Sequence, residues 1–139
     1  MDAMMLVEFK NNRIKPRTVE KYACAVLNHF FKRRFKKDVE VIVKFVKQHP
    51  EGQSGFAWEE EPDVYVVEVA RGATWPEEGY VEYQWYHQME TLAHELVHVK
   101  QFIRKEFNAG EWSMPYLEQP SEIEAAKMQK PLYEQYYGV

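Results

Sequence analysis

The apolar residues of this 139-residue chain change their spacing twice along the sequence. Between Thr18 and Phe35 they recur every three or four residues, as on one face of a helix. In Val39 to Val46 and in Asp63 to Ala70, short runs rich in β-branched residues predict strands. From Tyr86 to Phe107 the helical spacing returns. This order predicts an α+β domain in which helices pack against a small sheet.

The remaining elements are predicted from weaker signals. Gly79 to Trp85 is expected to form a third strand, and a last helix is expected from about Pro120 to Lys130, where Pro131 would break it. The predicted architecture is an N-terminal helix, a small mixed or antiparallel sheet and two further helices. Residues 1–139 are expected to form a single domain of this kind, since a chain of this length supports one core.

Turn-forming residues predict two connecting loops. Gln48 to Pro62 contains two prolines and two glycines, and Arg71 to Gly79 contains further glycines and a proline, so both are expected to be irregular. The acidic run Glu59 to Glu61 lies in the first of them and is expected to be solvated. An extended ligand could pair with an edge strand of the sheet, and the candidate for that strand is Val64 to Val69.

Composition excludes several classes of protein. A hydrophobic share of 45% supports a folded core, and the absence of an apolar run of about 20 residues argues against a membrane helix. The Met1-Asp2 start lacks the pattern of a signal peptide, and the single cysteine, Cys24, permits no intrachain disulfide. We therefore expect a protein of the cytoplasm that does not bind membranes.

The second helical segment contains the sequence His94-Glu95-Leu96-Val97-His98, which is H-E-x-x-H. Four residues advance a helix by slightly more than one turn, so both imidazoles lie on one face and can reach the same Zn²⁺. Glu95 is turned by about 100° from His94 and can accept a proton from water without binding the metal. The spacing predicts a zinc site in which Glu95 is the general base.

A catalytic zinc ion usually has three protein ligands, so a third ligand must be found. No histidine follows His98, which leaves a carboxylate from further along the chain. The candidates are Glu122 and Glu124 at the start of the last helix, and they point to different sides of it. Ser121 and Glu124 match a capping box, which would occupy Glu124 and favour Glu122 as the ligand.

These residues resemble the gluzincins, zincin metallopeptidases whose third ligand is a glutamate. The similarity lies in Thr91 to Gln101 and in Gln119 to Ala126, and it looks closest to small bacterial and phage members, including the ImmA/IrrE-type peptidases. The resemblance implies a minimal zincin-like fold and a cytoplasmic zinc peptidase, located in the host cytoplasm if phage-encoded. It also implies His94, His98 and Glu122 as metal ligands and Glu95 as the general base.

One position departs from the family pattern. The fourth residue after Glu122 is often Asp or Asn in relatives and is Ala126 here, so the residue that orients a metal-binding histidine must lie elsewhere. The side chain that stabilises the oxyanion also stays open. The candidates are His87 and five tyrosines, Tyr83, Tyr116, Tyr133, Tyr136 and Tyr137.

The expected partner is a protein or peptide substrate, and the alternative function is an inactive, zincin-like binding module for a protein or nucleic acid. Residues 1–50 contain 12 Lys and Arg against 5 Asp and Glu, although the net charge is −4. The densest basic cluster could contact phosphates, but basic residues also suit the end of a helix. The cluster consists of Lys32, Arg33, Arg34, Lys36 and Lys37.

Overall fold

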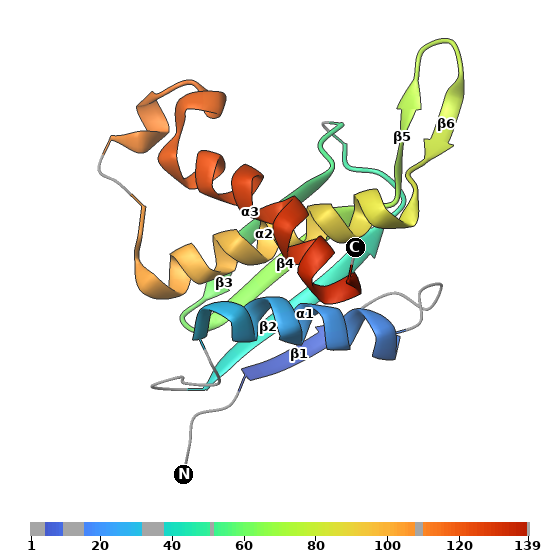
Figure 1. The fold of residues 1–139 in the computed structure, drawn as a ribbon. Coiled ribbons are helices and arrows are strands. Elements are labelled where there is room, and N and C mark those ends of the chain that lie inside the picture. Colours follow the sequence, from blue (N-terminus) through green and yellow to red (C-terminus); the bar gives the residue numbers. More distant parts are fainter. Residues whose placement is uncertain (1–4, 10–15, 32–37, 51, 108–109, 139) are drawn as a thin grey trace.

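A computed structural model of the protein describes residues 5–9, 16–31, 38–50, 52–107 and 110–138 (Figure 1). The architecture is α+β, with three helices and small sheets. The elements are β1 (Met5–Phe9), α1 (Pro16–Phe31), β2 (Val39–Val46), β3 (Gly55–Glu61), β4 (Val64–Ala70), β5 (Gly72–Trp75), β6 (Gly79–Glu82), α2 (Trp85–Arg104), the 3₁₀ turns η1 (Glu111–Ser113) and η2 (Tyr116–Glu118), and α3 (Pro120–Tyr137).

The main sheet has four strands in the order β1-β2-β4-β3. Strands β1, β2 and β4 run parallel to one another, whereas β3 runs antiparallel to β4. The sheet is therefore mixed. Alternate residues of β2 are buried, because the strand packs one face against the helices. Among the described strands, β3 is one edge of this sheet, and it lies against α2.

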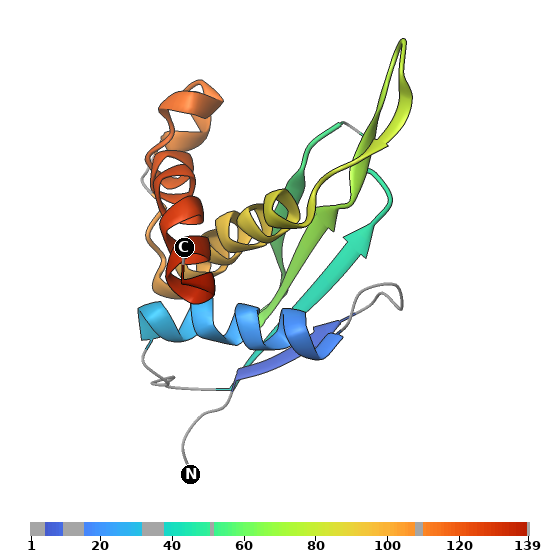
Figure 2. The ribbon, with the colours of Figure 1, turned by 45° about the vertical axis from the view of Figure 1, so that its right-hand side comes forward.

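All three helices lie on one side of the sheet (Figure 2). Helix α2 packs on β3 and β4, α1 packs on β1 and α2, and α3 packs mainly on α2. Helix α2 is thus held between the sheet and α3. As a result, twelve of its residues between Gln88 and Gln101 are buried. The shared core includes Val19, Tyr22, Leu27, Val41, Val43, Val67, Val69, Met89, Leu92, Leu96 and Val99.

Strands β5 and β6 form a separate two-stranded hairpin that extends beyond the main sheet (Figure 1). Its inner face is tied to the end of β2, because the Tyr80 hydroxyl donates to the Lys47 carbonyl at 3.0 Å and Thr74 Oγ1 donates to Gln48 Oε1 at 2.6 Å. The predicted loop Arg71 to Gly79 is therefore partly a strand. The predicted strand Gly79 to Trp85 is shorter and ends at Glu82.

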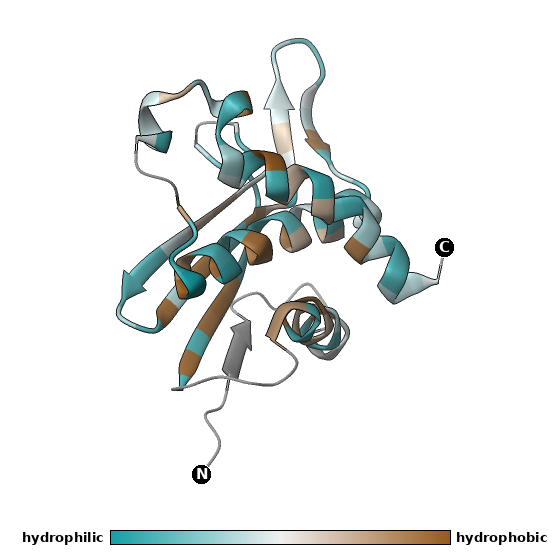
Figure 3. Ribbon diagram, turned by 60° about the vertical axis from the view of Figure 1, so that its left-hand side comes forward, coloured by the Kyte–Doolittle hydropathy of each residue, from teal (hydrophilic) through white to brown (hydrophobic). Residues whose placement is uncertain are grey.

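Two further predictions about the strands are wrong. Gln48 to Pro62 is not a simple loop, since β3 occupies Gly55–Glu61 and includes the acidic run. That run is exposed and forms the hydrophilic end of an edge strand (teal in Figure 3). Three charged residues in a row lack the apolar alternation from which a strand is predicted. The chain also has a strand, β1, before its first helix, and α1 connects β1 to the parallel β2.

The helices α1 and α2 begin close to the predicted residues, and α2 ends at Arg104, near the predicted Phe107. The predicted end of the first helix, Phe35, lies outside the described residues. Helix α2 ends when Lys105 adopts a left-handed conformation with φ 54°. Helix α3 continues through Pro131 to Tyr137, so the predicted break is wrong. Pro131 has no N–H to donate to the carbonyl of Lys127, four residues earlier. Both residues are exposed, so that carbonyl can bond to water instead. Residues 32–37, which contain the basic cluster, lie outside the described residues.

None of the helices in the described part of the chain is both long and apolar enough to cross a membrane.

Candidate metal centre

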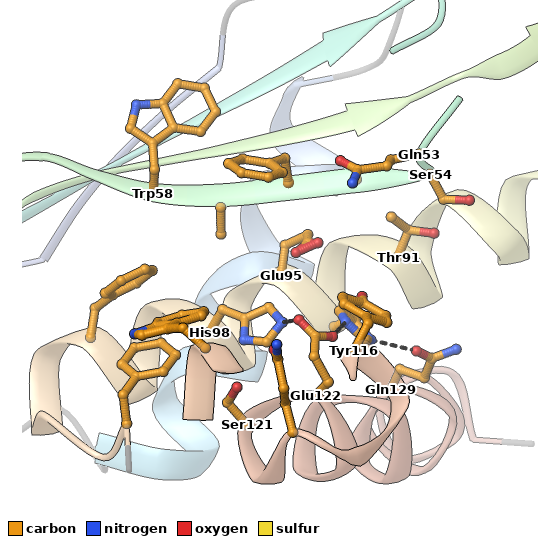
Figure 4. Close-up of a pocket in the computed structure, with 18 of the residues that line it drawn as sticks. Gln53, Ser54, Trp58, Thr91, Glu95, His98, Tyr116, Ser121, Glu122 and Gln129 are labelled. Carbon is orange, nitrogen blue, oxygen red and sulfur yellow. Dashed lines mark hydrogen bonds and ion pairs between the residues drawn. The ribbon is translucent and has the colours of Figure 1, made fainter. Parts of the chain in front are cut away.

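Helix α2 directs His94 and His98 toward α3, and their ring centroids lie 5.0 Å apart. Glu95 points instead toward β3, because its Cγ would lie 3.0 Å from a Cβ atom added to Gly55. Figure 4 shows His98 and Glu95 on different sides of one space. His94 lies one helical turn before His98 on the same face of α2, as the spacing predicts.

Helix α3 brings Glu122 to both histidines. Its Oε2 lies 3.1 Å from His94 Nε2, and its Oε1 lies 2.8 Å from His98 Nε2 (Figure 4). One carboxylate therefore contacts the same ring nitrogen of both histidines. All three side chains are at most 16% exposed, so water screens these contacts poorly.

The structure places Glu124 elsewhere, although the reason differs from the predicted capping box. Helix α3 begins at Pro120, its N-cap is Gln119, and no side chain of that residue caps it. The buried Glu111 carboxylate accepts a hydrogen bond from the Ser121 N–H at 2.7 Å. Glu124 contacts α2, where Lys100 Nζ donates to both of its oxygens at 2.8 and 2.9 Å.

Two glutamines hold the other nitrogen of each imidazole. His94 Nδ1 donates to Gln129 Oε1 at 2.8 Å, and His98 Nδ1 donates to Gln101 Oε1 at 2.7 Å. With a glutamine oxygen as acceptor, each Nδ1 carries a proton, so in the neutral form of either imidazole Nε2 keeps the lone pair that binds a metal. These contacts supply the orientation that Ala126 cannot provide.

Further contacts fix the orientation of the Gln101 amide. Its Nε2 donates to the Ser121 carbonyl at 2.9 Å and to Glu124 Oε1 at 2.8 Å, so its Oε1 must face His98. Glu124 is in turn held by Lys100, a cation that is only 2% exposed. Sequence reasoning missed this chain of contacts, because no local pattern links residues of α2 to residues of α3.

The site shifts the pKa values of its two carboxyl groups in opposite directions. Burial tends to raise the pKa of Glu122, but the adjacent imidazoles of His94 and His98, together with the hydrogen bond from the Tyr116 hydroxyl, outweigh it and hold that pKa well below its usual range. Burial raises the pKa of Glu95 to about 7, against the opposing charges of the two histidines. At neutral pH, Glu122 is a carboxylate, whereas Glu95 is poised to gain or lose a proton.

The histidines respond to the same neighbours. Burial by itself would lower the pKa of His94 and of His98, but the adjacent Glu122 carboxylate and the nearby charge of Glu95 raise both values overall. Without a metal, the negative groups of the site therefore favour protonated imidazoles. A metal ion that binds here has to displace those protons.

The donor atoms of this site fit a metal ion. His98 Nε2 is buried and has no hydrogen-bond partner in the described part of the chain, although Glu122 Oε1 is 2.8 Å away. The distance is that of an ion pair, but the direction is not that of a hydrogen bond. Ligand atoms of His94, Glu95 and His98 also lie within 4.8 Å of one another. Two imidazoles and one carboxylate, with a second carboxylate beside them, suit a catalytic zinc site.

Glycine at position 55 allows β3 to approach α2 at this site. A Cβ atom on Gly55 would lie 2.6 Å from Thr91 Cγ2 and 3.0 Å from Glu95 Cγ. Real Cβ atoms essentially never come as close as 2.6 Å to another heavy atom, so a residue with a Cβ atom here would require the strand or Thr91 to shift. Gly55 therefore sets the height of β3 above Glu95.

A cleft of about 800 Å³ opens over these residues and is bounded by β3, α2, the η turns and the start of α3. Of the candidate oxyanion donors, His87 and Tyr116 line it. The Tyr116 hydroxyl donates to Glu122, and burial together with this contact raises the pKa of Tyr116. The other candidates outside the cleft include three tyrosines that pack around Tyr22: Tyr133, Tyr136 and Tyr137.

The predicted edge strand is wrong. Val64 to Val69 lies in β4, which is flanked by β2 and β3 and has no free edge. The edge beside the cleft is β3, whose residues from Gly55 to Trp58 line it. The Trp58 ring points away from His98 and Glu122 (Figure 4), so the strand contributes mainly its backbone and small residues to the site.

Comparisons with known proteins add no relative. No family model matches the sequence, and neither a curated protein nor a solved structure matches the chain. A function for the chain therefore has to be inferred from the geometry of the site.

Proposed function

We propose that the protein is a zinc-dependent metallopeptidase with a minimal zincin-like domain of the gluzincin type. The observation that carries the proposal is the position of Glu122, whose carboxylate reaches Nε2 of both His94 and His98 from a second helix. Glu95 faces the same space from the side of β3. His94, His98 and Glu122 would hold the zinc ion.

Zinc at this position would supply a Lewis acid that polarises a carbonyl oxygen and makes water nucleophilic at neutral pH. Glu95 is the proton carrier of the reaction. Its carboxylate takes a proton from the attacking water, the new C–O bond forms at the peptide carbonyl carbon, and Glu95 then gives the proton to the departing amine nitrogen as the C–N bond breaks. In the metal-free site, burial raises the pKa of Glu95 to about 7, toward the range in which a carboxyl group can both accept and donate a proton at neutral pH.

Tyr116 is the preferred group for stabilising the oxyanion. It lines the cleft, and its hydroxyl, which donates to Glu122 in the structure, would donate to the oxyanion instead when Glu122 binds zinc. His87 lines the same cleft from the first turn of α2 and is the second choice. The substrate backbone would pair with the edge of β3, which leads it past Glu95.

The substrate class is a protein or peptide in an extended conformation, and the location we propose is the cytoplasm. The cleft is open along β3, and an extended backbone can use the hydrogen-bonding groups that an edge strand leaves unpaired. The half-buried Cys24 thiol is compatible with a reducing compartment.

The test compares zinc content and hydrolysis in three proteins. Wild type loaded with zinc should cleave quenched fluorescent peptides from a mixed-sequence library. Glu95→Gln should keep one zinc per chain and lose at least about 10³-fold in rate, because the proton carrier is gone. Glu90→Gln on the same helix is the matched control and should retain both properties.

Two outcomes would contradict the proposal. If Glu95→Gln cleaves the library as fast as wild type, the observed hydrolysis does not belong to this site. If zinc binds stoichiometrically but no peptide is cleaved, the alternative of an inactive binding module is favoured. If the module then binds nucleic acid, and neutralising the basic residues between positions 32 and 37 abolishes that binding, its partner is nucleic acid.

A further inference from the structure

We propose that Phe102, Phe107 and Trp112 form a specificity subsite that accepts a bulky apolar side chain of the substrate, next to the bond that is cut. The inference rests on the proposed function and names its substrate class: extended peptides with an aromatic or large aliphatic residue at one side of the scissile bond.

The three rings form a continuous wall beside the candidate metal ligands. Phe102 lies one helical turn after His98, on the same face of α2. The Phe102 and Phe107 ring centroids are 4.8 Å apart, and those of Phe107 and Trp112 are 5.3 Å apart. All three residues line the cleft that contains His98 and Glu122.

The wall is anchored at one end and open at the other. Phe102 stacks on the buried Tyr65 of β4 at 6.1 Å, which fixes its ring against the core. Trp112 is 67% exposed, although it packs on Phe107 and belongs to the short turn η1. A tryptophan held in place by a neighbouring ring, with two-thirds of its surface uncovered, is an apolar surface that a ligand can cover.

The opposite side of the cleft leaves room for such a side chain. Gly55 and Ala57 are the residues of β3 whose side faces α2, and neither projects far into the space. Trp58 points away from the site (Figure 4). A peptide paired with β3 would send alternate side chains toward α2, and the first of them beyond the metal ligands would meet the aromatic wall.

The occupant is a substrate side chain because the wall is continuous with the catalytic groups. The ring of Phe102 follows His98 on one helix, so a group that fills the wall must lie within reach of the reacting carbonyl. The rings carry no charge, and the charged groups of the cleft, Glu95 and Glu122, belong to the metal centre. The wall therefore selects for apolar size and shape.

Binding of amino-acid hydroxamates tests this subsite without requiring turnover. These probes chelate zinc through a common group and differ only in the side chain. On the zinc-loaded protein, phenylalanine hydroxamate should bind about 100-fold more tightly than glycine hydroxamate, measured by titration calorimetry. Trp112→Ala and Phe102→Ala should each reduce this ratio below about 10, with zinc content unchanged.

Matched variants make the result specific. Trp75→Ala removes another half-exposed tryptophan, on the β5–β6 hairpin and outside the cleft lining, and should leave the ratio at the wild-type value. Trp112→Phe keeps a ring in place and should retain most of the selectivity. Thermal unfolding of each variant would reveal a loss of fold.

The same proteins can be given the quenched peptide library, with cleavage sites mapped by mass spectrometry. Enrichment of Phe, Leu, Met, Trp or Tyr beside the cut bond, lost in Trp112→Ala, supports the subsite. If the hydroxamate ratio of wild type is near one, or survives in both wall variants, the subsite is wrong. If the ratio behaves as expected but no peptide is cut, the subsite stands and the proposed hydrolysis fails.

Discussion

The two imidazoles of the candidate metal centre are held in the same way, each by a glutamine oxygen at Nδ1. Gln129 and Gln101 lie on different helices, and Gln101 is itself fixed by Glu124 and the Ser121 carbonyl. We predict that Gln101→Leu and Gln129→Leu each weaken zinc binding by about 10- to 100-fold, because the ring loses its orientation and its preferred tautomer. Competition with a coloured chelator measures the affinity.

The control for this prediction is Gln135→Leu, an exposed position on α3 that should bind zinc like wild type. Nitrogen NMR of the histidine rings provides a readout that simple destabilisation would not change. In metal-free wild type at high pH, both rings should carry the proton on Nδ1, and the ring that loses its glutamine should show a mixture of tautomers. Equal zinc affinity in all four proteins would rule out the role of the glutamines.

Glu95 should make the stability of the metal-free protein depend on pH. Its pKa is raised from 4.5 to about 7 in the folded state, mainly by burial, so between these values the folded chain keeps a proton that the unfolded chain loses. The contribution of Glu95 to the free energy of unfolding is fully present below pH 4.5 and is lost as the pH rises through 7. Relative to wild type, Glu95→Gln should gain up to about 3 kcal/mol in the free energy of unfolding between pH 4.5 and about 8. Urea denaturation at several pH values measures the difference, and a difference that stays constant with pH would contradict the assignment.

Residue by residue, the sequence pattern located the helix that carries the histidines, but not what surrounds it. His94, Glu95 and His98 share one turn of helix, which spacing alone predicts. Glu122 lies beside them as expected, although the capping box that favoured it is absent. Gln129 lies within the predicted last helix, but it could not be predicted as a partner of His94, because no local pattern pairs a residue of α3 with a residue of α2.

At the scale of elements, the contact between β3 and α2 depends on a missing side chain. Gly55→Ala would place a methyl group 2.6 Å from Thr91 Cγ2, so the strand must move. We predict a loss of about 1–3 kcal/mol in the free energy of unfolding, and lower activity because the strand above Glu95 is displaced. Thr91→Ser removes the atom that clashes most, and should recover at least half of the loss in the double variant. Urea denaturation of the single and double variants measures the coupling, and purely additive costs would contradict the proposed contact.

Element prediction succeeded where apolar periodicity was strong and failed where a strand was short or charged. Strands β2 and β4 were predicted nearly to their ends, since both are rich in valine and buried between neighbours. Strand β3 was missed because three of its seven residues are glutamates, which are tolerated only at an exposed edge. That tolerance depends on where the strand lies in the sheet, which local sequence does not reveal.

For the whole molecule, zinc should act as a link between α2 and α3. The ligands would come from both helices, so binding adds to their apolar packing and raises the unfolding temperature. At a free zinc concentration of about 100 times Kd, the added stability is about 2.7 kcal/mol. Scanning calorimetry with zinc and with a chelator measures this. The metal-free chain should remain folded through its own core, and Glu122→Gln should lose most of the zinc-dependent increase. An undiminished increase in that variant would exclude Glu122 as a ligand.

Helix α3 supplies both the carboxylate that joins the two imidazoles and the amide that orients one of them. Sliding this helix along α2 by a single turn would separate both contacts together, whereas the valine-rich sheet and its packing on α2 would be untouched. The site can therefore hold a metal ion only while α3 keeps this position on α2. A molecule that inserted between α3 and α2 would inactivate the site without entering the cleft.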